Sequence, residues 1–296
     1  MKKLILAITV LSLAAAAPLR ADEIASAKKI FADKQDSVIW ITGVAKITLT
    51  ASGGSEGMPS IPEQEEKVMA LGTIVGSDGV VVTMLSAIDP ASQVKGRSVR
   101  TEGGMVKLDA TSVMKELKVV MPDGTEIPCE LVMKDVNLDL AVIRIKTSSK
   151  EASGMVYHPI DLKDNAEGHI LDEVVTIARM PEIFNRVPTV AVGHIGMVTK
   201  KPRVFLRADG AIGGCPTFNT DGKLIGITAG RTKGGRVVEA AIIPAADVMD
   251  VVEQSKNKKA EAEEPAKAED KSAKPAGTNK NDAADKKADK EGADKN

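Results

Sequence analysis

Short runs of apolar residues, separated by turns that contain glycine, follow one another along most of the chain. Several of these runs fold back around an Asp-Gly step or an Asn-Thr-Asp-Gly turn, which is the pattern of a β-hairpin. The sequence therefore predicts hairpins within residues 71–83, 119–132 and 211–227. Repeated short hairpins of this kind are typical of all-β proteins.

Further apolar stretches predict the remaining strands and two helices. A charged, Ala-rich segment over residues 22–36 predicts one helix, and an apolar stripe after Pro244 predicts another. The other strands are expected over residues 37–41, 135–145, 171–178, 189–197, 204–207 and 237–243.

Three segments lack a regular apolar pattern. Residues 52–67 are rich in Gly, Ser, Pro and Glu and are expected to form a surface loop, and residues 146–164 are expected to link two parts of the fold. Residues 254–296 consist mainly of Lys, Ala, Asp and Glu and contain no large apolar side chain. Such a segment buries too little apolar surface to offset its ordering entropy, so we expect a disordered tail.

The first 21 residues have the pattern of an export signal. Lys2 and Lys3 precede an apolar run from Leu4 to Ala17 that is short for a membrane span. We expect cleavage after Ala21, which leaves a mature protein in the periplasm or outside the cell. The alternative is a retained membrane anchor.

Composition and charge narrow the classes of ligand. The chain of 296 residues is 43% hydrophobic with a formal net charge of -1, so it lacks the basic excess that nucleic-acid binding uses. No His, Cys, Asp and Glu residues have metal-site spacing, and residues 72–79 lack the ending of a phosphate-binding loop. We therefore expect neither a metal nor a cofactor. Cys129 and Cys215 allow one disulfide, which the sequence leaves open.

Taken together, the motifs resemble one family. Residues 71–83, the Asp-x-x-x-Asp-Leu-Ala-Val pattern that begins at Asp135, and residues 211–227 occur in the order found in trypsin-like endopeptidases of the bacterial HtrA/Deg type. The resemblance implies an all-β chymotrypsin fold, with two six-stranded antiparallel β-barrels over about residues 37–146 and 168–243 and a short C-terminal helix. This domain would span residues 37–253. The family often carries PDZ domains after this point, and none fits the tail.

The resemblance also assigns the positions of a Ser-His-Asp triad. The catalytic His of the family falls on Ser86 and its nucleophilic Ser on Gly213, whereas its Asp is retained as Asp139. The oxyanion-loop positions fall on Ala211, Ile212 and Gly213, in a loop that is shorter than in the family. A triad needs a nucleophile, a base and an orienting carboxylate, and loss of either of the first two removes nearly all turnover. The sequence therefore favours a protein without protease activity.

Two kinds of residue elsewhere in the sequence could replace the missing nucleophile and base. Cys215 could serve as a nucleophile, as in viral relatives of the fold, but it lies two residues past the nucleophile position and needs a partner that lowers its thiol pKa. His158, His169 and His194 could supply a base, but none aligns with the catalytic His. An insertion over about residues 89–117 has no role that the sequence identifies.

These observations lead to three hypotheses of function. The first is an exported, inactive serine protease homologue that binds unfolded or extended peptide segments by adding them as a strand to the second barrel. The second is an active endopeptidase with a site rearranged around Cys215. The third is a structural envelope protein whose charged tail contacts cell-envelope polymers. The sequence leaves the oligomeric state open.

Overall fold

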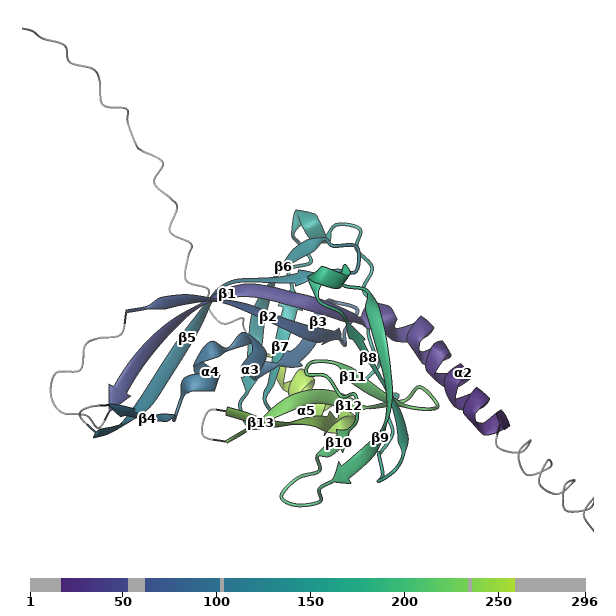
Figure 1. Ribbon diagram of the computed structural model, residues 1–296. Helices are drawn as coiled ribbons and strands as arrows, with labels where there is room; N and C mark the ends of the chain where they lie inside the picture. The colour runs from purple at the N-terminus through teal and green to yellow at the C-terminus, as the bar shows by residue number, and fades with distance from the viewer. Residues whose placement is uncertain (1–16, 53–61, 102–103, 234–235, 259–296) are drawn as a thin grey trace, which may run out of the picture. The chain divides into compact units, whose positions relative to one another are not determined.

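Two β-barrels with a helix before and a helix after them form the core of the computed structural model (Figure 1). The structure describes residues 17–52, 62–101, 104–233 and 236–258. Helix α2 (Ala17–Lys34) and the short 3-10 helix η1 (Gln35–Ser37) precede the first strand, and helix α5 (Ala245–Ser255) follows the last one. The prediction of two six-stranded antiparallel barrels with a short C-terminal helix is confirmed.

The first barrel is closed because its first and last strands pair with each other. Its strands neighbour one another in the order β1-β2-β3-β7-β6-β5, and the β1–β5 ladder completes the ring. Alternate side chains point inward and form an apolar interior that includes Ile41, Val81 and Ile143. The strands are β1 (Val38–Ser52), β2 (Gln64–Ile74), β3 (Val80–Met84), β5 (Gly104–Val120), β6 (Glu126–Asp135) and β7 (Leu140–Ile145).

The second barrel closes in the order β10-β13-β12-β11-β8-β9. Its interior is a smaller apolar cluster that includes Val174, Ile195, Ile225 and Ile242. The strands are β8 (Glu173–Arg179), β9 (Pro188–Val198), β10 (Leu206–Ala208), β11 (Pro216–Asn219), β12 (Leu224–Lys233) and β13 (Arg236–Pro244), with the 3-10 helices η2 (Lys150–Ala152) before the barrel and η3 (Glu182–Phe184) between β8 and β9.

A third apolar cluster contains residues of both barrels and forms the layer between them. Leu71 and Val142 of the first barrel belong to it together with Ile177, Ile227 and Ile243 of the second. Because these side chains are buried, separating the barrels would expose a large apolar area to water. The layer therefore fixes the two barrels against each other.

Hydrogen bonds at the edge of this layer also join the barrels. The indole Nε1–H of Trp40 donates to the carbonyl oxygen of Met180 at 2.9 Å. The guanidinium of Arg179, which is only 5% exposed, donates to backbone carbonyls of Val38 and Gln35 and pairs with Asp36. These contacts connect β8 of the second barrel to the start of β1.

The two terminal helices attach to the barrels by narrow apolar faces. Helix α2 buries Ala27 and Ile30, so the helix that the sequence predicts over residues 22–36 is present but begins earlier and ends at Lys34. Helix α5 buries Val248, Val251 and Val252, which confirms the apolar stripe expected there. Two further short helices, α3 (Leu85–Ile88) and α4 (Pro90–Val94), follow β3.

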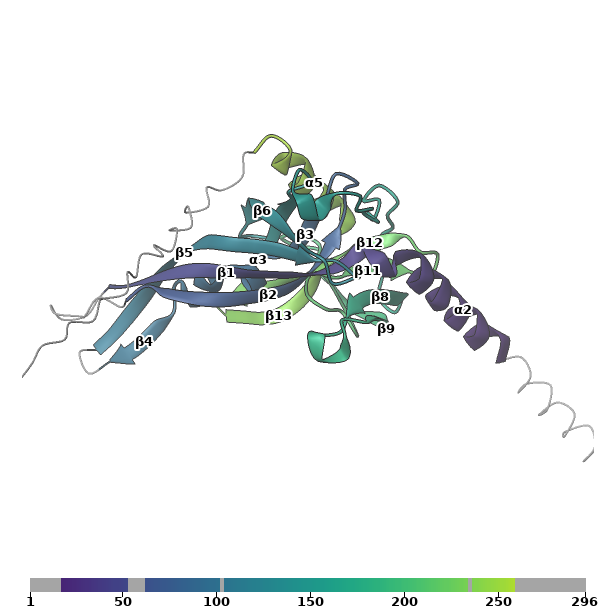
Figure 2. The same ribbon diagram turned by 90° about the horizontal axis from the view of Figure 1, so that it is seen from above.

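The insertion expected over residues 89–117 forms α4, strand β4 (Ser98–Thr101) and most of β5. The β1–β5 ladder runs from Trp40 opposite Val120 to Ser52 opposite Lys107, and β4 pairs with the outer end of β5. These strands form a β-arm that projects beyond the barrel (Figure 2).

The prediction of a loop over residues 52–67 is wrong for its last residues, because strand β2 already begins at Gln64. The first four residues of β2 are exposed and polar, so they lack the alternating apolar pattern of a strand. Charged pairs instead connect this region to neighbouring strands: Lys46 contacts Glu63 at 2.6 Å, and Lys115 pairs with Glu65. Residues 53–61 lie outside the described residues.

Two predictions fall mainly on parts of the chain that the structure does not describe. Residues 1–16 of the expected export signal and residues 259–296 of the expected tail are outside the described ranges. Helix α2 covers the last residues of the expected signal, from Ala17 to Ala21. Among the helices that are described, none combines the length and apolar character needed to cross a membrane.

Candidate functional site

The glycine turn, Gly213 and Gly214 before β11, lies between the two barrels and contacts both of them. Gly214 has φ +77°, and a Cβ atom there would lie 1.9 Å from the carbonyl oxygen of Leu71, so only glycine fits. Its N–H donates to Thr228 at 2.8 Å, and its carbonyl accepts from the hydroxyl of Thr73 at 2.8 Å. The turn that carries the nucleophile in the family is therefore held in place by both barrels.

Gly213, at the predicted nucleophile position, lies against Met84. A Cβ atom built on Gly213 would be 3.0 Å from Sδ and 3.3 Å from Cε of Met84. A serine at this position would need the methionine to move, because those distances are shorter than ordinary contacts. Gly213 itself offers no hydroxyl or thiol.

Ser86, at the predicted position of the catalytic histidine, is bonded to the retained aspartate. Its side chain is buried, at 1% exposure, in the short helix α3. Its N–H donates to Oδ1 of Asp139 and its hydroxyl donates to Oδ2 of Asp139, both at 2.8 Å. The amide of Gln93, from the inserted helix α4, donates to the Ser86 carbonyl at 2.8 Å.

Asp139 receives a third hydrogen bond from the second barrel. The N–H of Gly230 on β12 donates to Oδ2 at 2.8 Å. Asp139 is 4% exposed and has φ +58°, a backbone conformation that non-glycine residues adopt mostly at tight turns. Burial raises the pKa of the Asp139 carboxyl, and the hydrogen bonds from Ser86 and Gly230 partly oppose that shift. The carboxylate thus joins α3 of the first barrel to β12 of the second.

This arrangement lacks a base within the described part of the chain. His158, His169 and His194 are exposed, and none shares a hydrogen bond with Ser86, Asp139 or Cys215 there. His169 instead pairs with Asp172 at 3.3 Å. The Ser86 hydroxyl already donates its proton to a carboxylate, which is a much weaker base than an imidazole.

Cys215 is fully buried, with 0% exposure, in the layer between the barrels. Burial strongly raises the pKa of its thiol, so the thiolate needed for attack is disfavoured. Cys129 lies in the interior of the first barrel, and neither Cys129 nor Cys215 is in a disulfide, so the bridge that the sequence left open is absent between these two described residues. The geometry therefore does not favour Cys215 as a nucleophile.

The other two oxyanion-loop positions also have structural contacts. The carbonyl of Ile212 accepts a hydrogen bond from the Cys215 N–H at 3.0 Å, and Ala211 packs against the interior of the second barrel. The hydrogen bond from Cys215 closes the turn within the loop itself.

Sequence reasoning missed Met84 and Gly230, which complete the site. Met84 could have been found, because it comes two residues before the aligned position of Ser86. Gly230 carries no such signal, since it contacts Asp139 through its backbone. As for metals, no cluster of three or more His, Cys, Asp or Glu side chains that could hold an ion occurs in the described ranges.

Comparison with known proteins agrees with this geometry. Residues 70–227, slightly more than half of the chain, match the family of the trypsin-like peptidase domain. A relative from Rhizobium meliloti, named a probable periplasmic serine endoprotease DegP-like, is 30% identical over 176 residues, which cover 55% of this chain and 33% of the relative. A protein of the same name from Bartonella henselae is 31% identical over 147 residues, which cover 46% of this chain and 27% of the relative.

The chain therefore spans a third or less of the length of these curated relatives. The family match includes the hairpin before Ser86, Asp139 and the glycine turn, in the order that the motifs predicted. Together with the two closed barrels, these findings confirm the resemblance: the chain belongs to the trypsin-like peptidase family and is of the HtrA type.

Proposed function

We propose that this chain is a protease homologue that no longer hydrolyses peptide bonds and instead binds extended peptide segments. The observation that carries the proposal is the bonding of Asp139, whose carboxylate is occupied by Ser86 and Gly230 rather than by a histidine. Gly213 adds to it, because the nucleophile position has no reactive atom and faces Met84. A site without base or nucleophile supports binding without turnover.

The edge of β12 supports the peptide-binding part of the proposal. This strand pairs with β13 from Gly226 to Lys233, but its pairing with β11 ends at Ile227. The described residues beyond Thr228 therefore leave one edge of β12 without a strand partner, and on this edge the Gly230 N–H already donates to Asp139. An extended peptide can add a strand to such an edge through main-chain hydrogen bonds. Arg231, which stacks 4.2 Å from the ring centre of Phe205, borders this edge.

Export to the cell envelope is a second part of the proposal. It is supported by the basic and apolar pattern of the first 21 residues and by relatives that are named periplasmic. Fractionation of cells that express the full chain, or a chain without residues 1–21, tests it. Loss of envelope localisation in the shortened chain is expected, and identical fractionation of both would contradict export. Contact of residues 254–296 with envelope polymers stays a prediction.

Hydrolysis is tested with the purified full chain, an unfolded casein-like substrate and a fluorophosphonate probe. We expect neither cleavage nor labelling. Cleavage of the substrate that is abolished by changing Ser86, Gly213 or Cys215 would contradict the proposal that the chain does not hydrolyse peptide bonds.

Peptide binding is tested with the same unfolded segments in two forms, one with ordinary amides and one with alternate amides N-methylated. Because strand addition uses main-chain N–H groups, methylation should abolish binding. Binding that is indifferent to methylation would show that β12 does not pair with the peptide.

A further inference from the structure

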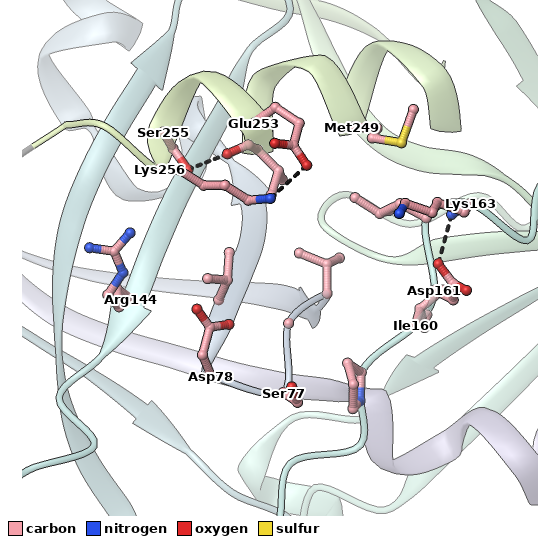
Figure 3. Close-up of a pocket in the computed structure, with 16 residues that line it drawn as sticks. Ser77, Asp78, Arg144, Ile160, Asp161, Lys163, Met249, Glu253, Ser255 and Lys256 are labelled. Atoms are coloured by element: carbon pink, nitrogen blue, oxygen red, sulfur yellow. Dashed lines mark hydrogen bonds and ion pairs between the residues drawn. The ribbon is translucent and has the colours of Figure 1, made fainter.

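A pocket of about 450 Å³ lies beneath α5 and shares no lining residue with the Asp139 site (Figure 3). Its walls come from the β2–β3 turn, β7, residues 159–163 between the barrels, and α5. Its floor is apolar, because Val80, Ile160 and Val252 belong to the layer between the barrels and Met249 packs against that layer. The pocket thus lies where the first barrel, the inter-barrel segment and the C-terminal helix meet.

Several charged and polar groups of the rim already have partners within the protein. The ammonium of Lys256 pairs with Glu253 at 2.7 Å, and a carboxylate oxygen of Asp161 accepts from the N–H of Lys163 at 2.8 Å. The hydroxyl of Ser255 donates to the carbonyl of Val252 at 2.7 Å. These contacts hold the end of α5 and the inter-barrel segment in shape, and they leave little for a ligand to satisfy.

Arg144 differs from these groups. It is half-buried on β7, between Val80 of β3 and Glu130 of β6, and its guanidinium makes no hydrogen bond or ion pair with any residue that the structure describes. Figure 3 shows it on the same side of the pocket as Asp78, with no bond between the two. A guanidinium presents a planar set of N–H donors that matches a carboxylate in a bidentate pair.

We propose that this pocket binds the carboxyl-terminal end of a short apolar peptide. The terminal carboxylate pairs with Arg144, and the last side chain covers the apolar floor formed by Val80, Ile160, Val252 and Met249. The carboxylate of Asp78 accepts a main-chain N–H of the same peptide. A pocket of this volume is suited to a small ligand of one or a few residues rather than to a folded partner.

The chemistry of the pocket argues against other small carboxylates and anions. An inorganic anion would use the guanidinium but gain nothing from the floor. A long-chain fatty acid would need an apolar channel, whereas here the floor is bounded by Asp78, Asp161, Glu253 and Lys256. A peptide end combines a carboxylate, an apolar side chain and main-chain N–H donors, which correspond to the three kinds of group present.

This site is separate from the β12 edge, and the two proposals stand or fall independently. Strand addition at β12 is insensitive to whether the peptide ends in a carboxylate, whereas the pocket requires one. A charge difference at the peptide terminus therefore reports on the pocket alone.

The test titrates the purified full chain with N-acetyl-Ala-Ala-Leu carrying a free carboxylate and with the same peptide as its carboxamide, by isothermal calorimetry. We expect the carboxylate form to bind at least about tenfold more tightly, since a charge-assisted bidentate pair is lost in the amide. Arg144→Met should reduce this preference to about equal binding. Arg207→Met is the matched control, because Arg207 lies on β10 and already pairs with Glu239, and it should keep the preference.

Any of three results with the two peptide forms would overturn the proposal: no binding of the carboxylate form, equal binding of both forms to the unchanged protein, or an unchanged preference in Arg144→Met. The comparison of the two peptide forms uses the unchanged protein, so it decides the matter even if a variant fails to fold. Decanoate that competes as well as the peptide would also overturn it, because the peptide's N–H groups would then contribute nothing.

Discussion

The Asp139 site and the pocket beneath α5 both connect the first barrel to later parts of the chain, but their charged groups differ in one respect. At Asp139, three hydrogen bonds from Ser86 and Gly230 occupy a carboxylate that is 4% exposed. In the pocket, the guanidinium of Arg144 has no partner among the described residues. A buried polar group whose hydrogen-bond partners are all present leaves nothing for a ligand to satisfy, whereas a charge without a partner can be satisfied by a ligand. We infer that the triad position now serves as part of the scaffold.

A similar contrast exists between two hollows of the same size. The hollow beside α4, also about 450 Å³, is lined by Lys134 and Asp89, which lie 3.5 Å apart, and Asp89 also accepts from the hydroxyl of Ser112. Lys95 pairs with Asp109, and Asp139 accepts from Ser86 and Gly230, so each of these charged groups already has a partner in the protein. The pocket with Arg144 differs because its guanidinium is left for a ligand to pair with.

The largest loss is expected from Gly214→Ala, which disrupts the bonded region directly. The new Cβ atom would lie 1.9 Å from the carbonyl oxygen of Leu71, and that carbonyl is itself held by the Thr83 hydroxyl at 2.6 Å. Since backbone cannot give way easily, we expect the free energy of unfolding to fall by at least about 4 kcal/mol, or the protein not to fold. Urea denaturation followed by circular dichroism measures it.

Gly124→Ala is the control for backbone conformation alone. Gly124 has φ +87°, but a Cβ atom there would meet no atom within 4 Å. Its loss should be about 1 kcal/mol, the cost of a left-handed alanine. Equal losses at the two glycines would mean that the glycine turn is not wedged between the barrels.

A smaller but still large loss is expected from Asp139→Ala. This change leaves the donors of Ser86 and Gly230 buried without an acceptor, which should lower the free energy of unfolding by about 3 kcal/mol. The matched control is Asp123→Ala, because Asp123 is exposed and accepts a hydrogen bond from the N–H of Thr125 at 2.9 Å. That variant should lose less than about 1 kcal/mol in the same urea titration. A neutral Asp139→Ala would contradict the scaffold role.

Much of the fold could be predicted because its hairpins are local. Asp78-Gly79 and Asp123-Gly124 mark turns between strands that are neighbours in sequence, and both glycines have positive φ. The position of Asp139 followed from its motif for the same reason. In contrast, the bond from Gly230 to Asp139 joins residues that are 91 positions apart and uses a backbone N–H, so no side-chain pattern indicates it.

The β-arm could not be predicted because its strands are not patterned by burial. Between Gly104 and Glu116 of β5, only Val106 and Ala110 are buried, and the first four residues of β2, which pairs with β1 of the arm, are exposed. Periodicity of apolar residues detects only strands with one buried face. The sequence also could not predict that the Arg144 guanidinium has no partner among the described residues, because this depends on how α5 and residues 159–163 pack around it.

The free energy of unfolding should depend on pH through the carboxyl group of Asp139. Burial raises the pKa of this carboxyl above its ordinary value, so the folded state holds the proton more tightly than the unfolded state. The contribution of this group to stability is then fully present below the pKa of the unfolded state and is lost as pH rises through the raised pKa of the folded state. Urea titrations of the unchanged protein and Asp139→Asn, from about pH 4 to about pH 7, should give a difference in unfolding free energy that changes in this window. A difference that is constant with pH would contradict the shift.

The smallest effect on stability is expected from Arg144→Met. Because Arg144 has no partner to lose in the described structure, its replacement should change the free energy of unfolding by less than about 0.5 kcal/mol. Arg179→Met removes a buried strand arginine that donates to Val38 and Gln35 and pairs with Asp36, so it should cost about 3 kcal/mol. Only Arg144→Met should remove the preference for a peptide carboxylate. Equal losses of unfolding free energy in the two variants would contradict the absence of a partner for Arg144 in the folded protein.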